Sequence, residues 1–129
     1  MITIIPFRPN KRPVETCQPS VCLLPFGFAP VAAANEALRR AGITWEDVSA
    51  VELNEAFAVQ SLACVDTWKI DPEIVNTKGG ALALGASGGR ILGTLAKRLV
   101  ESGDRYGIAS ICTGVGQALA VVLENGARS

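Results

Sequence analysis

The sequence predicts an α/β protein with a single folded core, in which a mixed sheet of about four strands packs against about three helices. The chain has 129 residues, a length that suits one hydrophobic core. Hydrophobic residues make up 49% and charged residues 19%, which is the composition of a globular domain. From residue 30 onward, apolar residues recur first at helical spacing and then in short strand-like runs.

The first 26 residues differ from the rest of the chain. They hold five of the 7 prolines and none of the 13 glycines. Proline removes a backbone donor and fixes φ, so this stretch excludes a long helix or a central strand. We therefore predict two parts: a proline-rich, non-homologous leader or arm over residues 1–26, and an incomplete folded domain over residues 27–129.

The first half of this domain predicts a helix, a strand and a second helix. A helix is expected from residue 30 to Gly42, where glycine ends it, because Val31, Ala34, Leu38 and Ala41 recur at helical spacing. Residues 48–53 are short and partly alternating, as in a strand, and Asn54 follows them directly. Residues 55 to about 66 then read as a helix that is apolar around most of its circumference.

The second half begins with a glycine-rich stretch, residues 79–89, which encloses a brief Ala/Leu run at 81–84. This stretch lacks the spacing of a phosphate-binding loop. A long helix is expected from there to about Glu101, with Ser87 as its N-cap and Gly103 beyond its end. Residues 106–112 and 116–124 predict a buried hairpin that turns at residues 113–115.

Composition also excludes several functions. The 12 basic residues balance the 12 acidic ones, which argues against nucleic-acid or anionic-membrane partners. The chain contains no histidine, and its four cysteines are irregularly spaced, so neither a zinc site nor any other metal site is expected. No apolar run reaches the roughly 18 residues that a membrane span needs. We expect a cytoplasmic protein with reduced thiols.

Two polar residues occupy positions where such folds place active sites. Asn54 lies at a strand-to-helix junction, where its carboxamide either caps the helix or holds a water or an oxyanion. Cys112 lies near the tip of the hairpin, where it is either a packed small residue or a proton donor and acceptor. The residues by themselves leave both alternatives open.

Three motifs contain these residues and occur in a fixed order. They are Glu52-Leu-Asn54-Glu55-Ala-Phe-Ala58, Asn76-x-x-Gly79-Gly80-Ala-Leu-Ala-Leu-Gly85 and Gly107-Ile-Ala-Ser-Ile-Cys112-Thr-Gly114-Val-Gly116. Together they closely resemble the three C-terminal motifs of the thiolases, the acetyl-CoA C-acyltransferases of fatty acid metabolism. The resemblance runs from about residue 27 to residue 124.

The resemblance implies the C-terminal half of the thiolase fold and an acyl transfer between CoA thioesters. In that reaction acyl-CoA and acetyl-CoA give 3-ketoacyl-CoA and CoA, or the reverse thiolysis occurs. Asn54 would hold a water in an oxyanion hole, and Cys112 would move the α-carbon proton. Glu55, Gly85 and Gly114 are assigned to oxyanion or loop support. CoA thioesters enter only as substrates, and no cofactor is implied.

The sequence departs from the family in two places. No segment resembles the N-terminal half with its nucleophilic cysteine, and Cys17 and Cys22 match nothing in that half. The family loop Gly-His-Pro-x-Gly-x-Ser-Gly is shortened, because Gly85 leads directly to Ala86-Ser87-Gly88 and the histidine is missing. We therefore expect the chain to be inactive alone and to expose a surface that associates readily with other protein surfaces.

Three alternatives to this hypothesis remain at this stage. The chain is a non-catalytic interaction module that docks on a thiolase subunit, a truncated or frame-shifted gene product, or a sequence from which a loop has been dropped.

Overall fold

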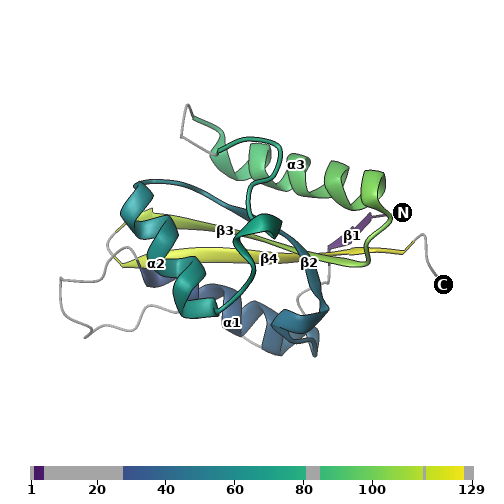
Figure 1. Cartoon of the computed structure of the whole chain (residues 1–129), viewed down its shortest axis with the longest axis horizontal. Helices are drawn as coiled ribbons and strands as arrows, with labels where there is room; N and C mark the ends of the chain where they lie inside the picture. The colour runs from purple at the N-terminus through teal and green to yellow at the C-terminus, as the bar shows by residue number, and fades with distance from the viewer. Residues whose placement is uncertain (1, 5–27, 81–84, 115, 127–129) are drawn as a thin grey trace.

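The computed structural model describes residues 2–4, 28–80, 85–114 and 116–126. The described residues form three α-helices and four strands, which confirms the predicted α/β class (Figure 1). Their order is β1 (Ile2–Ile4), α1 (Ala29–Ala41), β2 (Val48–Leu53), α2 (Ala58–Trp68), α3 (Ser87–Ser102), β3 (Tyr106–Gly114) and β4 (Gln117–Asn125). Two short 3-10 turns complete the fold: η2 (Trp45–Asp47) precedes β2, and η3 (Pro72–Ile74) follows α2.

The sheet is mixed, with the strand order β1-β4-β3-β2. β2 runs parallel to β3, while β4 is antiparallel to both β3 and β1. The short strand β1 belongs to the segment predicted as an arm, and it pairs Ile2 with Asn125 at an edge of the sheet. An edge position agrees with the expectation that this proline-rich segment contains no central strand.

Several predicted boundaries are right because a local signal sets them. Helix α1 ends at Gly42, whose φ of 74° is the left-handed conformation that glycine adopts readily. Strand β2 covers the predicted residues 48–53. Helix α3 stops before Gly103, with φ 72°. The hairpin is present, but its strands extend to Gly114 and from Gln117, so its turn lies later than predicted, and Val115 is outside the described residues.

Two helix starts differ from the prediction. Helix α2 begins at Ala58 rather than at residue 55, because residues 54–57 form a separate turn in which the Ala56 amide donates to the Asn54 carbonyl oxygen (3.2 Å). In α3 the N-cap is Ala86, with φ 49°, and Ser87 is already the first helical residue. The predicted Ala/Leu run at 81–84, like Cys17 and Cys22, lies outside the described residues.

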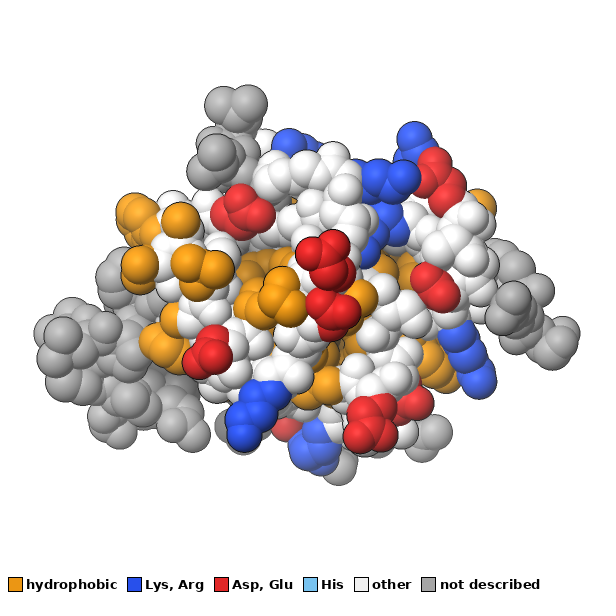
Figure 2. Space-filling model, in the orientation of Figure 1, with side chains coloured by type: hydrophobic (Ala, Val, Ile, Leu, Met, Phe, Trp, Pro, Cys, Tyr) orange, Lys and Arg blue, Asp and Glu red, His pale blue; other side chains and the backbone are white. Residues whose placement is uncertain are grey.

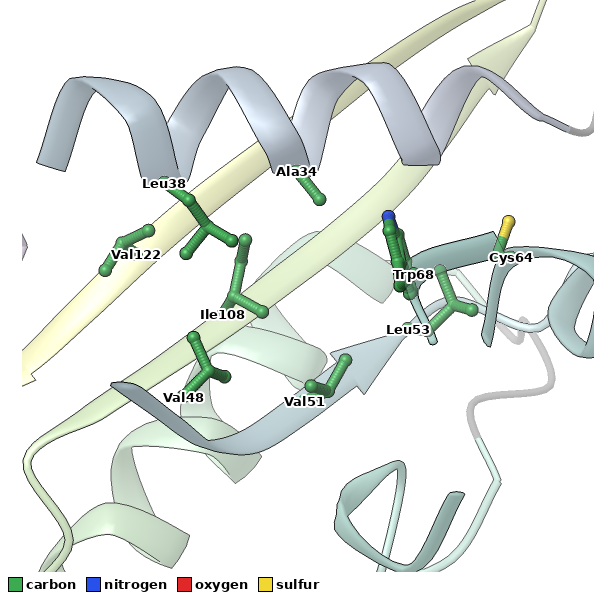
Figure 3. Close-up of a cluster of buried hydrophobic side chains, with 9 residues drawn as sticks. All are labelled: Ala34, Leu38, Val48, Val51, Leu53, Cys64, Trp68, Ile108 and Val122. Atoms are coloured by element: carbon green, nitrogen blue, oxygen red, sulfur yellow. The ribbon is translucent and has the colours of Figure 1, made fainter. Parts of the chain in front are cut away.

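The two faces of the sheet are covered by different helices. Helices α1 and α2 lie on one face and α3 lies on the other (Figure 1). The larger core, between the sheet and α1 and α2, is shown in Figure 3; it contains Ala34, Leu38, Val48, Val51, Leu53, Cys64, Trp68, Ile108 and Val122. Each buried aliphatic side chain of this kind stabilises the fold by about 1.5–3 kcal/mol.

The two tryptophans of the chain connect the elements of this larger core. The ring centroids of Trp45 and Trp68 are 4.9 Å apart and tilted by 38°. The Trp45 indole donates to Asn35 Oδ1 of α1 (2.9 Å), and the Trp68 indole donates to the Val31 carbonyl oxygen of the same helix (3.5 Å). These contacts hold η2 and α2 against α1.

The α3 face has a smaller core and a buried ion pair. Its buried members are Ala50, Ile91, Leu95, Leu99, Ala109 and Leu123. Beside them Arg98 donates to Glu52 Oε1 (2.6 Å), to the Val51 carbonyl oxygen (3.0 Å) and to the Ile74 carbonyl oxygen (2.9 Å). Burial raises the pKa of the Glu52 carboxyl, and the hydrogen bond and charge of Arg98 oppose that rise.

Candidate active site

The parallel pairing of β2 with β3 brings Asn54 and Cys112 to the same edge of the sheet, the one formed by the C-terminal ends of these two strands. Leu53 is in register with Ser110, and the Asn54 amide donates to the Ser110 carbonyl oxygen (2.9 Å). Cys112 follows two residues further along β3. Since parallel strands end at the same edge, the first and third sequence motifs meet there, as the carboxyl ends of strands meet in α/β active sites.

Asn54 is buried, with 4% of its surface exposed. Its side-chain oxygen Oδ1 has no hydrogen-bond partner among the residues that the structure describes. The helix-capping alternative is wrong, because α2 begins four residues later and its N-cap is Phe57. A buried carbonyl oxygen with no partner is costly, by about 1–3 kcal/mol, and such groups in native structures commonly accept a hydrogen bond from water or a ligand.

Cys112 is half-buried on β3. Side chains alternate along a strand, so Cys112 shares a face with Ile108 and Ser110, the face that carries the larger core. The ladder shifts register between Cys112 and Gly114, and Gly114 has a φ of 92° that favours glycine. Thr113 and Gly114 are exposed. The thiol therefore lies where the strand leaves the packed interior.

A second thiol, which the sequence analysis did not single out, lies on α2. Cys64 is fully buried, and Gln60 Nε2 donates to its sulfur (3.5 Å). Burial raises the pKa of the Cys64 thiol, the Gln60 hydrogen bond lowers it, and a negative charge on Cys112 raises it further. The available signal was the i, i+4 spacing of Gln60 and Cys64, which is common on helices and indicates no particular function.

Two of the other predicted support residues, Glu55 and Gly85, precede helices. Glu55 follows Asn54 in the turn before α2, and its carboxylate accepts a hydrogen bond from Asn76 Nδ2. Gly85 has a φ of 91°, a conformation that L-residues rarely adopt, and it precedes the start of α3. The roles of Asn54, Cys112, Glu55, Gly85 and Gly114 in catalysis stay predictions.

Two hollows, of about 310 and 300 Å³, lie along α3 beside the loop at residues 77–80. Lys78, Arg98 and Glu101 line both hollows and Glu52 lines the first, but neither lining contains Asn54 or Cys112. Neither candidate residue therefore faces these two hollows. Within the described ranges, no group of three or more His, Cys, Asp or Glu side chains could hold a metal ion, and no helix is long and apolar enough to cross a membrane.

Fold and site thus define an α/β domain with a buried carboxamide and a half-buried thiol at one edge of a mixed sheet. A family model described as the C-terminal domain of thiolase matches residues 14–125. The match begins inside the segment predicted as a non-homologous arm, and the domain boundary at residue 27 stays a prediction. Because the matched range covers most of the sequence, this chain belongs to the thiolase family.

Two relatives agree with this membership. The chain is 43% identical over 129 residues to a 3-ketoacyl-CoA thiolase of Aliivibrio fischeri, with 93% of this chain and 32% of the relative covered. It is 45% identical to a 3-ketoacyl-CoA thiolase of Vibrio vulnificus, with coverage of 86% and 30%. The chain thus spans about a third of the length of these relatives.

Solved structures show the same fold. Human mitochondrial 3-ketoacyl-CoA thiolase matches with a TM-score of 0.75 and 40% identity, over 79% of this chain and 27% of that chain. A structure of the same human enzyme in complex with CoA matches equally well. The predicted membership of the family is therefore confirmed, and so is the predicted fold.

Proposed function

We propose that this chain contributes the asparagine and the acid–base cysteine of a 3-ketoacyl-CoA thiolase site and does not complete turnover by itself. The observation that carries the proposal is the buried, unpartnered Asn54 Oδ1 among the described residues, at the edge that the Cys112 segment also reaches. A water that donates one hydrogen to Asn54 Oδ1 would donate its second hydrogen to the thioester oxygen as that oxygen becomes negatively charged.

In the direction of condensation, the Cys112 thiolate would take a proton from the α-carbon of acetyl-CoA. The resulting carbanion would form a carbon–carbon bond to an acyl group, whose thiolate leaving group departs. The acyl carrier in this step would be a cysteine thioester of another thiolase segment. Catalysis by this chain alone is not expected, because it has no histidine to activate such a nucleophile, and acid–base catalysis typically contributes about 10²–10⁴ in rate.

The test is a steady-state thiolysis assay with acetoacetyl-CoA and CoA, run on three preparations. The first is the purified chain, for which we expect no turnover above background. The second adds a thiolase N-terminal segment with its nucleophilic cysteine. The third uses the same mixture with His-Pro-Leu-Gly inserted between Gly85 and Ala86, and here we expect turnover that disappears in Cys112→Ala and in Asn54→Ala.

Three results would contradict the proposal. A third preparation without turnover would refute the contribution of this chain to a thiolase site. Turnover by the chain alone that requires Cys112 would refute the predicted inactivity. A third preparation whose turnover survives Cys112→Ala would refute the role of this thiol.

A second candidate function is docking on a thiolase subunit without catalysis. It is supported by apolar side chains exposed near the start of α2: Phe57 at 60%, Val59 at 79% and Leu62 at 70%. Figure 2 shows hydrophobic side chains gathered over this end of α2. Exposed apolar clusters commonly mark protein interfaces.

Co-expression with a complete thiolase followed by size-exclusion chromatography tests this candidate. A docking module co-elutes with the enzyme, and Val59→Lys with Leu62→Lys abolishes co-elution. The matched control is Thr67→Lys, on an exposed residue at the other end of α2. Separate elution of the unmodified chain would refute docking.

A further inference from the structure

We propose that Asn76 is a positioning residue whose carboxamide fixes the turn that carries Asn54 and Glu55. Its relevance to the reaction rests on the proposed function, whereas the positioning itself rests on contacts within the chain. Asn76 opens the second sequence motif, and its neighbours in the sequence indicate no role for it.

The backbone brings Asn76 alongside the end of β2. Val75 forms a parallel bridge with Val51, and the Asn76 amide donates to the Val51 carbonyl oxygen (2.9 Å). Asn76 has a φ of 50°, the left-handed conformation that asparagine tolerates better than most residues. The chain therefore runs beside β2 for a short distance and then turns away at Asn76.

Beyond this turn the Asn76 backbone no longer pairs with β2, and the Asn76 side chain bonds to β2 instead. Leu53 donates its amide to Asn76 Oδ1 (2.9 Å), and Asn76 Nδ2 donates to the Leu53 carbonyl oxygen (2.9 Å). A carboxamide has the same donor and acceptor as a peptide group. Asn76 thus pairs with both main-chain groups of the last residue of β2, as a neighbouring strand would.

These bonds act on Asn54 from the side opposite to β3. Leu53 is bonded to Asn76, and the next amide, that of Asn54, is bonded to the Ser110 carbonyl oxygen. The peptides on both sides of the Leu53 α-carbon are therefore restrained, and the second of them leads into Asn54. A loss of the Asn76 carboxamide would release both bonds to Leu53 and let the buried Asn54 side chain reorient.

Glu55 is restrained by the same residue. Asn76 Nδ2 donates to Glu55 Oε1, and the carboxylate lies so close to Gly80 that a β-carbon there would be 2.7 Å from Glu55 Oε2. Gly80 therefore leaves the space that the carboxylate occupies. This contact joins the first and second motifs through two residues that are 21 positions apart in the sequence.

The main test is Asn76→Gly, which keeps the left-handed backbone and removes the carboxamide. In the full chain we expect amide hydrogen exchange at Leu53 and Asn54 to accelerate about tenfold or more, as for loss of a local hydrogen bond. The side-chain amide resonances of Asn54 should shift. Amides of α1 and β4 should change by less than about twofold, because the opening is local.

Lys69→Gly is the matched control. Lys69 also has a left-handed φ, 56°, and is exposed at the end of α2. This control should leave exchange at residues 53–55 unchanged, which separates removal of the carboxamide from the effect of adding a glycine. Asn76→Asp is the conservative variant: it keeps an acceptor for the Leu53 amide and should preserve that amide's protection while the Glu55 signals shift.

Gly80→Ala tests the other contact. Its β-carbon should displace the Glu55 carboxylate and shift the Glu55 and Asn76 side-chain signals, while the Leu53 amide stays protected. In the reconstituted enzyme with the inserted histidine loop, Asn76→Gly should lower kcat about tenfold or more, with KM for CoA within about twofold, as for loss of an interaction with the reacting groups.

The outcomes separate the two proposals. Uniformly faster exchange after Asn76→Gly, or unchanged exchange and unchanged Asn54 resonances, would overturn the positioning role. Equal effects of Lys69→Gly at residues 53–55 would overturn it as well. If the reconstituted enzyme shows no turnover, the proposed function fails, and a local exchange response at residues 53–55 still supports positioning by Asn76.

Discussion

The two faces of the sheet are held by different forces. On the face of α1 and α2, nine buried residues form a continuous core whose members are almost entirely apolar. On the face of α3, six buried residues form a smaller core. Hydrogen bonds add to it, chiefly those of Arg98 to Glu52 and to two carbonyl oxygens. Burial of apolar area tolerates small shifts, whereas buried polar groups require defined partners. The α3 face therefore fixes positions more sharply than the other face does.

The sharpest test of this comparison is Arg98→Met. Removal of one partner leaves Glu52 buried without its counter-charge, which typically costs about 3–5 kcal/mol. Burial already raises the folded pKa of Glu52 above its ordinary value of 4.5, so the folded state binds the proton more tightly than the unfolded state does. Stability linked to this group is therefore greatest below that value and falls as the pH rises, and the variant strengthens this trend.

Urea unfolding at about pH 8 and about pH 5 measures this effect, and we expect the loss in Arg98→Met to be larger at the higher pH. The double variant Glu52→Leu with Arg98→Met should recover much of the stability, because it removes both charges. An Arg98→Met chain as stable as the unmodified one at the higher pH would show that the pair does not hold this face.

A smaller effect is expected from Gly107→Ala, which adds a methyl group on the α3 face. The β-carbon would lie 2.7 Å from Leu95 Cδ1 and 3.1 Å from the Ala50 carbonyl oxygen. Overpacking of this kind typically costs about 1–3 kcal/mol. Thermal or urea unfolding should show the loss, and the added variant Leu95→Ala should make Gly107→Ala less harmful than it is alone. Equal costs in both backgrounds would contradict the steric cause.

On the face of α1 and α2, a substitution at Ile108, the residue after Gly107, should destabilise the fold less. Ile108→Val removes one methyl group from the larger core and should cost about 0.5–1.5 kcal/mol. No titratable partner is involved in this loss, so it should be the same at about pH 5 and about pH 8. A cost that changes with pH, measured by the same unfolding assay, would contradict the division between the two faces.

The smallest effect concerns the outer side of α1. The hydrogen bond from Arg39, with further contributions from Arg40, lowers the pKa of Glu36 to about 2. A lowered folded pKa contributes stability above the ordinary value of 4.5 that is lost as the pH falls towards about 2. Solvent screens this pair, so Glu36→Gln should cost only about 0.5 kcal/mol near neutral pH. The difference from the unmodified chain should shrink below about pH 4 in urea unfolding, and a constant difference would refute the ion pair as its cause.

Sequence alone predicted those features that depend on near neighbours. Gly42 and Gly103 end helices because glycine adopts left-handed backbone readily, and residues 48–53 form a strand because their pattern suits a sheet. The start of α2 was predicted too early. The conformation of residues 54–57 depends on hydrogen bonds to Ser110 and Asn76. These partners lie far away along the chain, so the local sequence gives no signal of them.

The candidate site shows the same limit. Asn54 and Cys112 were singled out from their motifs, and their shared edge follows from the strand pairing. The roles of Arg98 and Asn76 were not predicted, because their partners Glu52 and Leu53 lie 46 and 23 residues away. Only the three-dimensional arrangement shows that such polar side chains face carbonyl and amide groups of β2.

The close pair of Trp45 and Trp68 gives the chain a built-in optical reporter. Both indoles lie on the face of α1 and α2, and the sequence contains no other tryptophan. Coupled aromatic rings produce a circular dichroism signal that disappears when the rings separate, so this signal monitors one half of the architecture selectively. Local opening around α3 would leave the signal intact, while detachment of α2 would abolish it.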